Sequence, residues 1–267
     1  KFNSSKSKMM IFGKDRNPEM DVRLGDSVIE VVSSSPHMGV VLTDSRKYQS
    51  SAVGAKIQSA KKDLGTILSI GSISVPASIE IRSHLYWSVC MSRLSYGSEI
   101  AGYNEQSIIQ FEKFHGHAAK VIQGMPNQTV NAACLAPLGW MSFQGYVDLK
   151  MMLFLWRILL LPVSCIYRQV VIARLWYHIY CRDGVHLGPS NDIVERFKKY
   201  AMLDMLVEAL CHAKITSIGI MKGLVRKTIV EYENKCYQAT VLLYKRIVYF
   251  WEMYTQYRYD AMVCFCK

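Results

Sequence analysis

The sequence contains no apolar run long enough to cross a bilayer. Its most apolar stretch covers residues 151–163, and Arg157 and Pro162 lie within it. About 20 consecutive apolar residues are needed to span the hydrocarbon core. We therefore expect a buried core helix here rather than a membrane span, and no membrane partner.

The chain also lacks the cysteine pattern of a disulfide-stabilised protein. Its eight cysteines are scattered, and only Cys264 and Cys266 lie close together. A chain of this length can bury a core without such cross-links. We expect a reducing compartment, and thus an intracellular protein of the nucleus, the cytoplasm or both.

No motif for a metal ion, a nucleotide or covalent catalysis stands out. Cys165, His178, Cys181 and His186 come nearest to a zinc set, but their spacings match no strong pattern for a closed tetrahedral site. A Gly-rich phosphate loop is absent, and no Ser-His-Asp or Cys-His arrangement has supporting context. We predict no metal site and no cofactor in this chain.

The sequence has neither an initiating Met nor a signal peptide. A polar, lysine-bearing run at residues 3–8 leads straight into the apolar residues 9–12. A signal peptide would instead place a positive region, an apolar region and small residues in that order. We therefore expect the natural protein to begin upstream of Lys1.

What the sequence does contain is a large apolar fraction and an excess of positive charge. Apolar residues make up 51% and charged residues 20%, which is typical of a folded domain, and the formal net charge is +11. Basic side chains gain free energy by releasing counterions from phosphates, so this excess favours a polyanionic partner. A basic protein without any nucleic-acid partner remains the alternative.

Hydrophobic patterning divides the chain into a short β part and a long helical part. Strand candidates cover residues 8–12, 22–24, 28–32 and 38–42, and Gly25-Asp26 is a good tight-turn pair. Three- and four-residue apolar steps begin near residue 50, as in Val53, Ile57 and Ala60. Helices are expected at residues 76–93, 108–122, 143–161, 163–181, 193–213 and 221–257. The predicted fold class is α+β and mostly α: a small antiparallel β meander followed by a helical bundle.

Several short motifs then occur in a specific order. They are NSSKSK at residues 3–8, PHMGV at 36–40, RLSYGSE at 93–99, FEKF at 111–114, GMP at 124–126 and APLGW at 136–140. In this order they resemble the downstream half of the reverse transcriptase of non-LTR (LINE-type) retrotransposons. His37-Met38 stands where that family more commonly has Tyr-Leu.

The resemblance implies a division of the chain into three parts. Residues 1–48 would be the end of the polymerase palm, with motifs D and E. Residues 49–162 would form the helical thumb-like region, and residues 163–267 a helical C-terminal region of unassigned role. The implied partners are an RNA template, a DNA primer and the polymerase segment upstream.

The resemblance also implies that this chain lacks the chemical centre of its parent enzyme. Nucleotidyl transfer uses two metal ions, Mg²⁺ in the intact parent, held by clustered carboxylates. The chain has no Asp-Asp pair, and its aspartates are isolated from one another. We therefore predict that this RNA-directed DNA polymerase fragment is inactive by itself.

Site residues carried over from the family lie in the β part and the first helix. Lys6 is the candidate proton donor to pyrophosphate, with Lys8 as a neighbour at the nucleic acid. His37 and Gly39 would belong to the primer grip, where glycine permits close approach of a nucleic-acid backbone. The expected phosphate contacts of the first helix are Arg46, Lys47, Lys56, Lys61 and Lys62.

Each of these interpretations has a plainer alternative. The lysines fit solvated positions before an edge strand or on a helix face equally well, and Gly39 fits an ordinary hairpin. The whole chain could also be an inactive retroelement remnant, or a non-catalytic basic helical adaptor that binds nucleic acid or protein.

Overall fold

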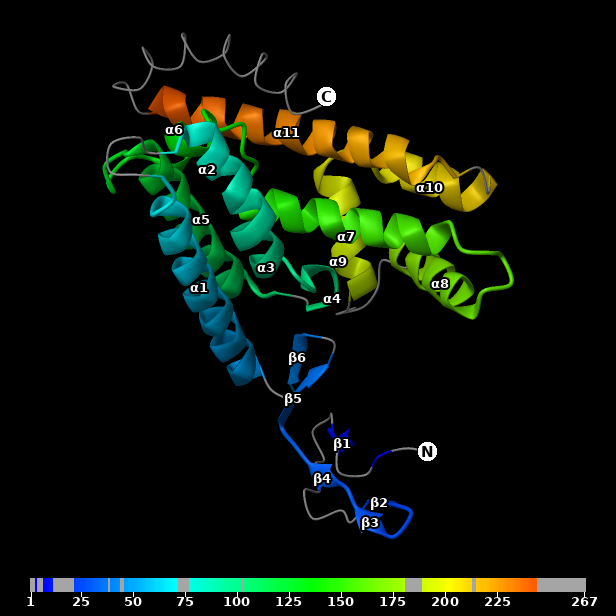
Figure 1. The fold of residues 1–267 in the computed structure, drawn as a ribbon. Coiled ribbons are helices and arrows are strands. Elements are labelled where there is room, and N and C mark those ends of the chain that lie inside the picture. The colour runs from blue at the N-terminus through cyan, green and yellow to red at the C-terminus, as the bar shows by residue number, and fades with distance from the viewer. Residues whose placement is uncertain are drawn as a thin grey trace.

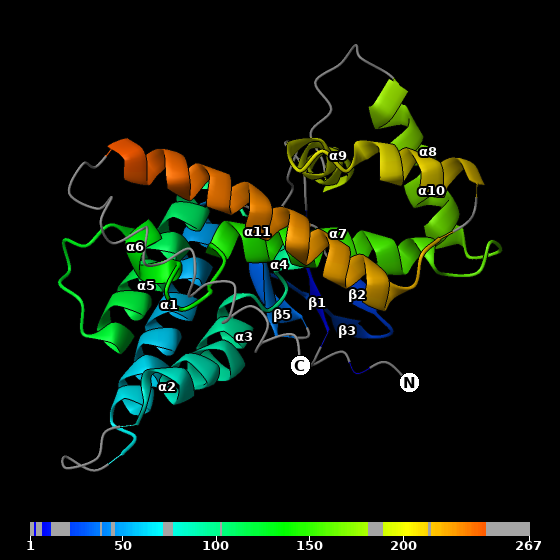
Figure 2. The same ribbon diagram turned by 90° about the horizontal axis from the view of Figure 1, so that it is seen from above.

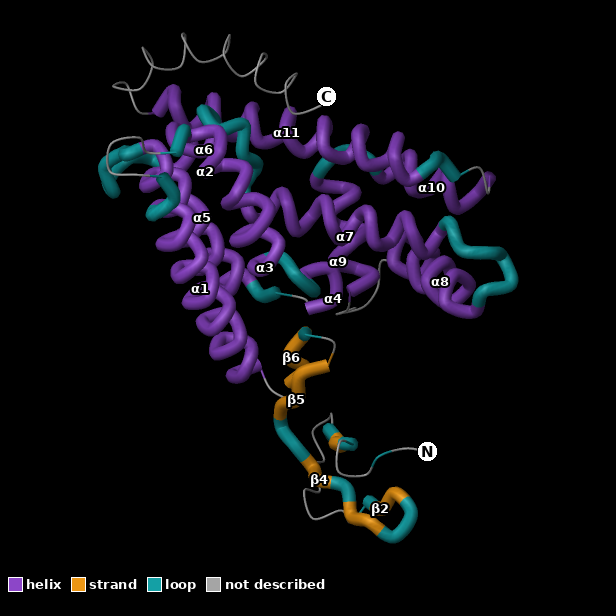
Figure 3. Tube along the Cα trace, in the orientation of Figure 1, coloured by secondary structure: helices purple, strands orange, loops and turns teal. Residues whose placement is uncertain are grey.

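The computed structural model describes residues 3, 7–11, 22–37, 39–43, 46–71, 77–101, 103–180, 189–212 and 215–243. The chain is mostly helical, with a few short strands near its N-terminus, as the sequence predicts in outline (Figure 1). The strands lie below the helices in that view, and those of residues 34–43 are nearest to the N-terminal end of the first helix (Figure 3).

The strands form separate two-stranded sheets instead of the single antiparallel meander that the sequence suggests. They are β1 (Lys8–Met9), β2 (Arg23–Leu24), β3 (Ser27–Val28), β4 (Glu30–Val31), β5 (Ser34–His37) and β6 (Val40–Thr43). β1 pairs with β4 in parallel, whereas β2 pairs with β3 and β5 with β6 in antiparallel fashion. Among the described residues, each strand pairs with one other strand, and most of the strands have only two residues. The prediction of one antiparallel meander was therefore wrong in how the strands pair.

The helical part has long helices joined by short connections. They are α1 (Arg46–Leu68), α2 (Ile79–Leu85), η2 (Tyr86–Met91), α3 (Ser92–Leu94), α4 (Ser98–Ala101), α5 (Glu105–Gln123), α6 (Asn131–Leu135), α7 (Phe143–Leu159), α8 (Ile166–Tyr180), α9 (Pro189–Lys199), α10 (Leu203–His212) and α11 (Ile218–Leu243). α2, η2 and α3 follow one another without a break, and the middle piece is π-helical. Such π segments interrupt α-helices at single turns.

Side-chain caps explain where several of these helices begin and end. Ser78, Asn104 and Ser142 accept hydrogen bonds from backbone N–H groups in the first turns of α2, α5 and α7. These bonds satisfy donors that a helix leaves free at its N-terminus. Gly124 ends α5 with a φ of 67°, a conformation that glycine adopts without steric cost.

α7 is the central helix of the core. Met152, Leu155 and Trp156 are among its fully or almost fully buried side chains. It packs against α4, α5, α8, α9 and α11, and α11 lies along it in Figure 1 and Figure 2. The prediction of a buried core helix is thus confirmed. Among the described helices, none is both long enough and apolar enough to cross a membrane.

Candidate nucleic-acid interface

The β5–β6 hairpin docks on the turn between α3 and α4. Gly39 has a φ of 78°, and a Cβ atom built there would lie 3.1 Å from Cε1 of Tyr96. Gly97 has a φ of 71°, and its Cβ would lie 2.5 Å from Cγ2 of Val40. Two glycines therefore let the hairpin and the turn approach more closely than side chains would allow.

Lys56 of α1, which is half-buried, binds the same turn. Its ammonium donates hydrogen bonds to the backbone oxygen of Tyr96 at 2.6 Å and to the Tyr103 hydroxyl at 2.8 Å. The ammonium also lies 5.6 Å from the centre of the Tyr103 ring, within cation–π range. Burial, and then the charge of Lys150, lowers the pKa of Lys56 to about 8.

Lys150 of α7 holds the turn from the other side. Its ammonium donates a hydrogen bond to the backbone oxygen of Ser95 at 2.6 Å and forms an ion pair with Oε2 of Glu99 at 3.0 Å. Burial alone would raise the pKa of Glu99, but its backbone hydrogen bond and the Lys150 contact bring the pKa below its usual value. α1, α7 and the hairpin thus meet at residues 95–99.

The outward face of α1 is basic and carries small residues. Lys61 and Lys62 are exposed, together with Ala55, Gln58 and Gly65. Within the part of the chain that the structure describes, neither lysine has an ion-pair partner.

The one acidic residue of α1 points elsewhere. Asp63 forms an ion pair with Arg93, in which Oδ2 lies 2.8 Å from Nη1. The same guanidinium donates a hydrogen bond to the Ser59 hydroxyl at 2.7 Å. The positive charge of Lys61 and Lys62 is therefore not neutralised from within the helix.

The structure places the other predicted nucleic-acid contacts as follows. Lys8 forms an exposed ion pair with Glu30 at 3.5 Å, and His37 is exposed at the end of β5, opposite Val40. Arg46 and Lys47 begin α1, but their side chains lie outside the described residues. Lys6 also lies outside them.

Lys56 differs from Lys61 and Lys62 because its ammonium makes hydrogen bonds within the protein. The structure brings Gly39 and Lys56 together at Tyr96, whereas Lys61 and Lys62 lie on the solvent side of α1. The signal for this difference is in the sequence: Lys56 comes three residues after Val53 and four before Ala60, both fully buried. Those spacings place it next to the apolar stripe.

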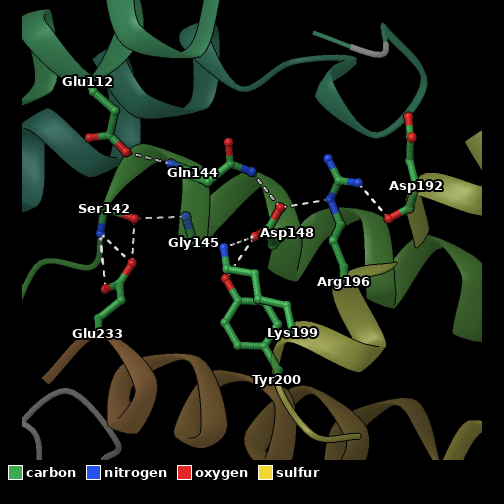
Figure 4. A network of polar contacts seen from close by, with 10 residues as sticks. All are labelled: Glu112, Ser142, Gln144, Gly145, Asp148, Asp192, Arg196, Lys199, Tyr200 and Glu233. Atoms are coloured by element: carbon green, nitrogen blue, oxygen red, sulfur yellow. Dashed lines mark hydrogen bonds and ion pairs between the residues drawn. The ribbon is translucent and has the colours of Figure 1, made fainter. Parts of the chain in front are cut away.

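A second polar cluster, which sequence reasoning missed, surrounds Asp148 of α7 (Figure 4). This carboxylate is 1% exposed and accepts bonds from Arg196 Nε at 2.7 Å and Lys199 Nζ at 3.0 Å. Tyr200 donates to it at 2.7 Å and Gln144 at 2.6 Å. Burial, and then the Asp148 charge, raises the pKa of the Tyr200 phenol. Asp148 stands as a single acidic residue within the apolar helix predicted at residues 143–161. That placement could have indicated a buried ion pair.

Two further carboxylates hold the N-terminus of α7 (Figure 4). Glu112 accepts from the backbone N–H of Gln144 at 2.8 Å. Glu233 of α11 accepts from the N–H of Ser142 at 3.1 Å and from its hydroxyl. Negative charge is favourable at a helix N-terminus. Burial raises the pKa of Glu112 despite these hydrogen bonds. Both clusters join α7 to neighbouring helices.

His115 is fully buried in an aromatic cluster and joins α5 to its neighbours. Its Nδ1 lies 2.8 Å from the Tyr86 hydroxyl and its Nε2 lies 3.0 Å from the backbone oxygen of Met141. Trp140 stacks on the rings of His115 and Tyr86. Burial lowers the pKa of His115 to about 4, so this imidazole is neutral at pH 7.

No group of His, Cys, Asp and Glu side chains with the geometry of a metal site occurs among the described residues. Of the weak zinc set, Cys181 and His186 lie outside them. Comparisons with protein-family models, with curated proteins and with solved structures gave no significant match to this chain.

Proposed function

We propose that this chain is the end of the palm and the thumb of a non-LTR retrotransposon reverse transcriptase, and that it holds an RNA–DNA duplex by its backbone. The observation that carries this proposal is the docking of the β5–β6 hairpin on residues 95–99, beside the N-terminal end of α1. Two segments that resemble separate motifs of the family, residues 36–40 and 93–99, thereby become one structural unit.

Electrostatics supports the duplex as the partner. The net charge is +11, and the exposed lysines of α1 lack internal partners among the described residues. Phosphate contacts of this kind give affinity and position without reading sequence. His37 and Gly39 would supply the primer grip in this arrangement, and Lys61 and Lys62 the contacts to the duplex backbone.

The chemical step belongs to carboxylates that this chain does not supply. In the intact enzyme, Mg²⁺ ions would activate the primer 3′-hydroxyl and stabilise the leaving pyrophosphate. Lys6 would act there as an auxiliary proton donor. The chain alone is expected to bind a template-primer and to leave it unextended.

The test is the salt dependence of binding to an RNA–DNA hybrid. The salt slope, meaning the magnitude of the negative slope of log K against log salt, falls by about 0.9 for each lost phosphate contact on a DNA duplex. We expect the double variant K61Q/K62Q to lower this slope by about 1.8. A matched double variant on α11, K222Q/K235Q, removes the same charge from two exposed lysines and should leave the slope unchanged. Equal effects of both double variants would contradict a thumb that uses α1.

A second candidate function, a protein-binding adaptor, is favoured by an exposed apolar face on α8. Tyr167 is 73% exposed and Val163, just before the helix, is 70% exposed. Ile166, Val170, Tyr177 and Tyr180 continue this face. Large exposed apolar patches commonly mark interaction sites. An in-frame Ala-Asp-Asp hairpin in the coding sequence upstream would support the polymerase over the adaptor. Failure to bind a hybrid at low salt would favour the adaptor or an inactive remnant.

A further inference from the structure

We infer that Lys56 is a positioning residue, which fixes the β5–β6 hairpin on residues 95–99 from a half-buried position and makes no phosphate contact of its own. Lys150 completes this arrangement from α7. The inference rests on the proposed function for its consequence at the duplex, but the positioning itself can be tested on the free chain.

The first step is that the Lys56 ammonium is already occupied. An ammonium has three N–H donors, and two of them bind Tyr96 and Tyr103 at 2.6 and 2.8 Å. One N–H donor is left over, so a phosphate could engage Lys56 strongly only by breaking bonds in a half-buried position, where an unpaired polar group is costly. Lys61 and Lys62 carry no such cost.

The second step is that the group held by Lys56 directly contacts the hairpin. Lys56 binds the carbonyl of Tyr96, and the ring of that residue lies against Gly39. Gly97 follows at once and lies against Val40. The turn that Lys56 holds is therefore in contact with Gly39 and Val40 of the hairpin.

The third step is that a second cation confines the turn. Lys150 binds the carbonyl of Ser95, so two consecutive carbonyls are held by ammonium groups from two different helices. Glu99 pairs with Lys150 and offsets the repulsion between the two lysines. The turn is therefore held by a network of three side chains, and replacing either lysine should loosen it.

The experiment separates positioning from phosphate contact by comparing two lysines of the same helix. In K56M, amide hydrogen exchange of residues 39–43 in the free chain should accelerate by about tenfold, as expected when a local contact opens. Hybrid binding should weaken while its salt slope stays unchanged. In K62M, exchange should stay unchanged while the salt slope falls by about 0.9.

A second variant guards against misfolding of K56M. G97A keeps the Lys56 side chain, but its Cβ would meet Val40 and alanine is strained at a φ of 71°, so the hairpin should move away from the turn and the same exchange should accelerate. Adding V40A removes the Cγ2 atom that a Cβ at position 97 meets, so G97A/V40A should recover part of the protection.

The possible outcomes distinguish the inference from the proposed function. Unchanged exchange in K56M, or a K56M salt slope that falls as it does in K62M, would overturn the positioning role even if the hybrid binds. Faster exchange in K56M together with no hybrid binding by the unmodified chain would support the positioning role and refute the proposed function.

Discussion

Arg196 Nε of α9 lies 2.7 Å from Oδ1 of Asp148, so a guanidinium holds a carboxylate that is almost completely removed from solvent on α7. Lys199 and Tyr200 bind the other oxygen of the same carboxylate. Four hydrogen-bonded partners make this acid the polar centre of the α7–α9 contact. Its removal would leave Arg196 Nε and the Lys199 ammonium without the carboxylate that they bind.

D148A is therefore expected to destabilise the protein by about 3–5 kcal/mol, the range for breaking a buried ion pair on one side. The free energy of unfolding in urea measures this effect. E208A is the control, because Glu208 is exposed on α10 and its replacement should change stability by less than about 0.5 kcal/mol. A loss below about 1 kcal/mol in D148A would show that the cluster is solvated in solution.

His115 should make stability depend on pH between 6.5 and 4. Its pKa is lowered to about 4 in the folded chain, so below pH 6.5 the unfolded chain binds a proton that the folded chain does not. Stability is then fully present above pH 6.5 and decreases as the pH falls, by up to about 3 kcal/mol at pH 4. The measurement is the free energy of unfolding against pH, taken as the difference between the unmodified chain and H115Q. A difference that stays constant across this range would contradict a neutral, buried imidazole.

G145A should be destabilising, although alanine normally favours a helix. A Cβ at position 145 would collide with Oε1 of Glu233 and would lie 3.0 Å from Cγ2 of Ile229. We expect a loss of about 1–3 kcal/mol, as for other overpacked sites. G223A on α11 is the matched control, because a Cβ there meets nothing within 4 Å. It should stabilise the protein by up to about 1 kcal/mol. Thermal unfolding should show a lower midpoint temperature for G145A and a higher one for G223A. Equal changes in the two midpoints would refute the close α7–α11 contact.

Lys56 should lose its proton at a lower pH than ordinary lysines. With a pKa of about 8, about half of its side chains are neutral at pH 8, whereas an exposed lysine with a pKa near 10.4 is almost fully charged. The rate of acetylation of Lys56 by a small reagent, followed site by site with mass spectrometry, should rise through a midpoint near pH 8. A midpoint near pH 10 would mean that Lys56 is solvated.

Sequence patterns predicted the long helices well because their apolar spacing is unambiguous. Val53 and Ala60 do lie on the buried stripe of α1, and the segment predicted at 143–161 is α7, the core helix. α1 begins four residues earlier than the pattern suggests. Asn104 and Gly124, the caps of α5, bracket the helix that was predicted at 108–122.

One predicted helix was wrong because its interruption has no sequence signal. Residues 193–213 were expected to form a single helix, but α9 ends at Lys199 and α10 begins at Leu203. Ala201 adopts a φ of 53°, and the N–H of Met202 donates a hydrogen bond to the backbone oxygen of Phe197 at 2.8 Å. This is the hydrogen bonding of a helix C-terminus, where glycine is the usual residue. Burial of Tyr200 and Met202 outweighs the cost of a left-handed alanine.

The candidate site was predictable only in part. Resemblance to a family selected residues 36–40 and 93–99 separately. Their contact depends on glycine at positions 39 and 97, where a Cβ atom would keep the two segments apart. Lysine-rich spacing selected Lys56, Lys61 and Lys62 together, because residue type alone cannot tell an internal hydrogen bond from a solvated ammonium. The structure separates these lysines by their partners.

The cap that Glu233 provides to Ser142 has a consequence for shortened forms of the chain. A fragment that stops at residue 162 would retain α1, α5 and α7 but would lose the only acceptor described for the Ser142 N–H. It would also uncover the side of α7 that α11 protects from water. Such a fragment is expected to aggregate or to be cleaved rapidly by proteases, so expression trials should keep α11 with α7.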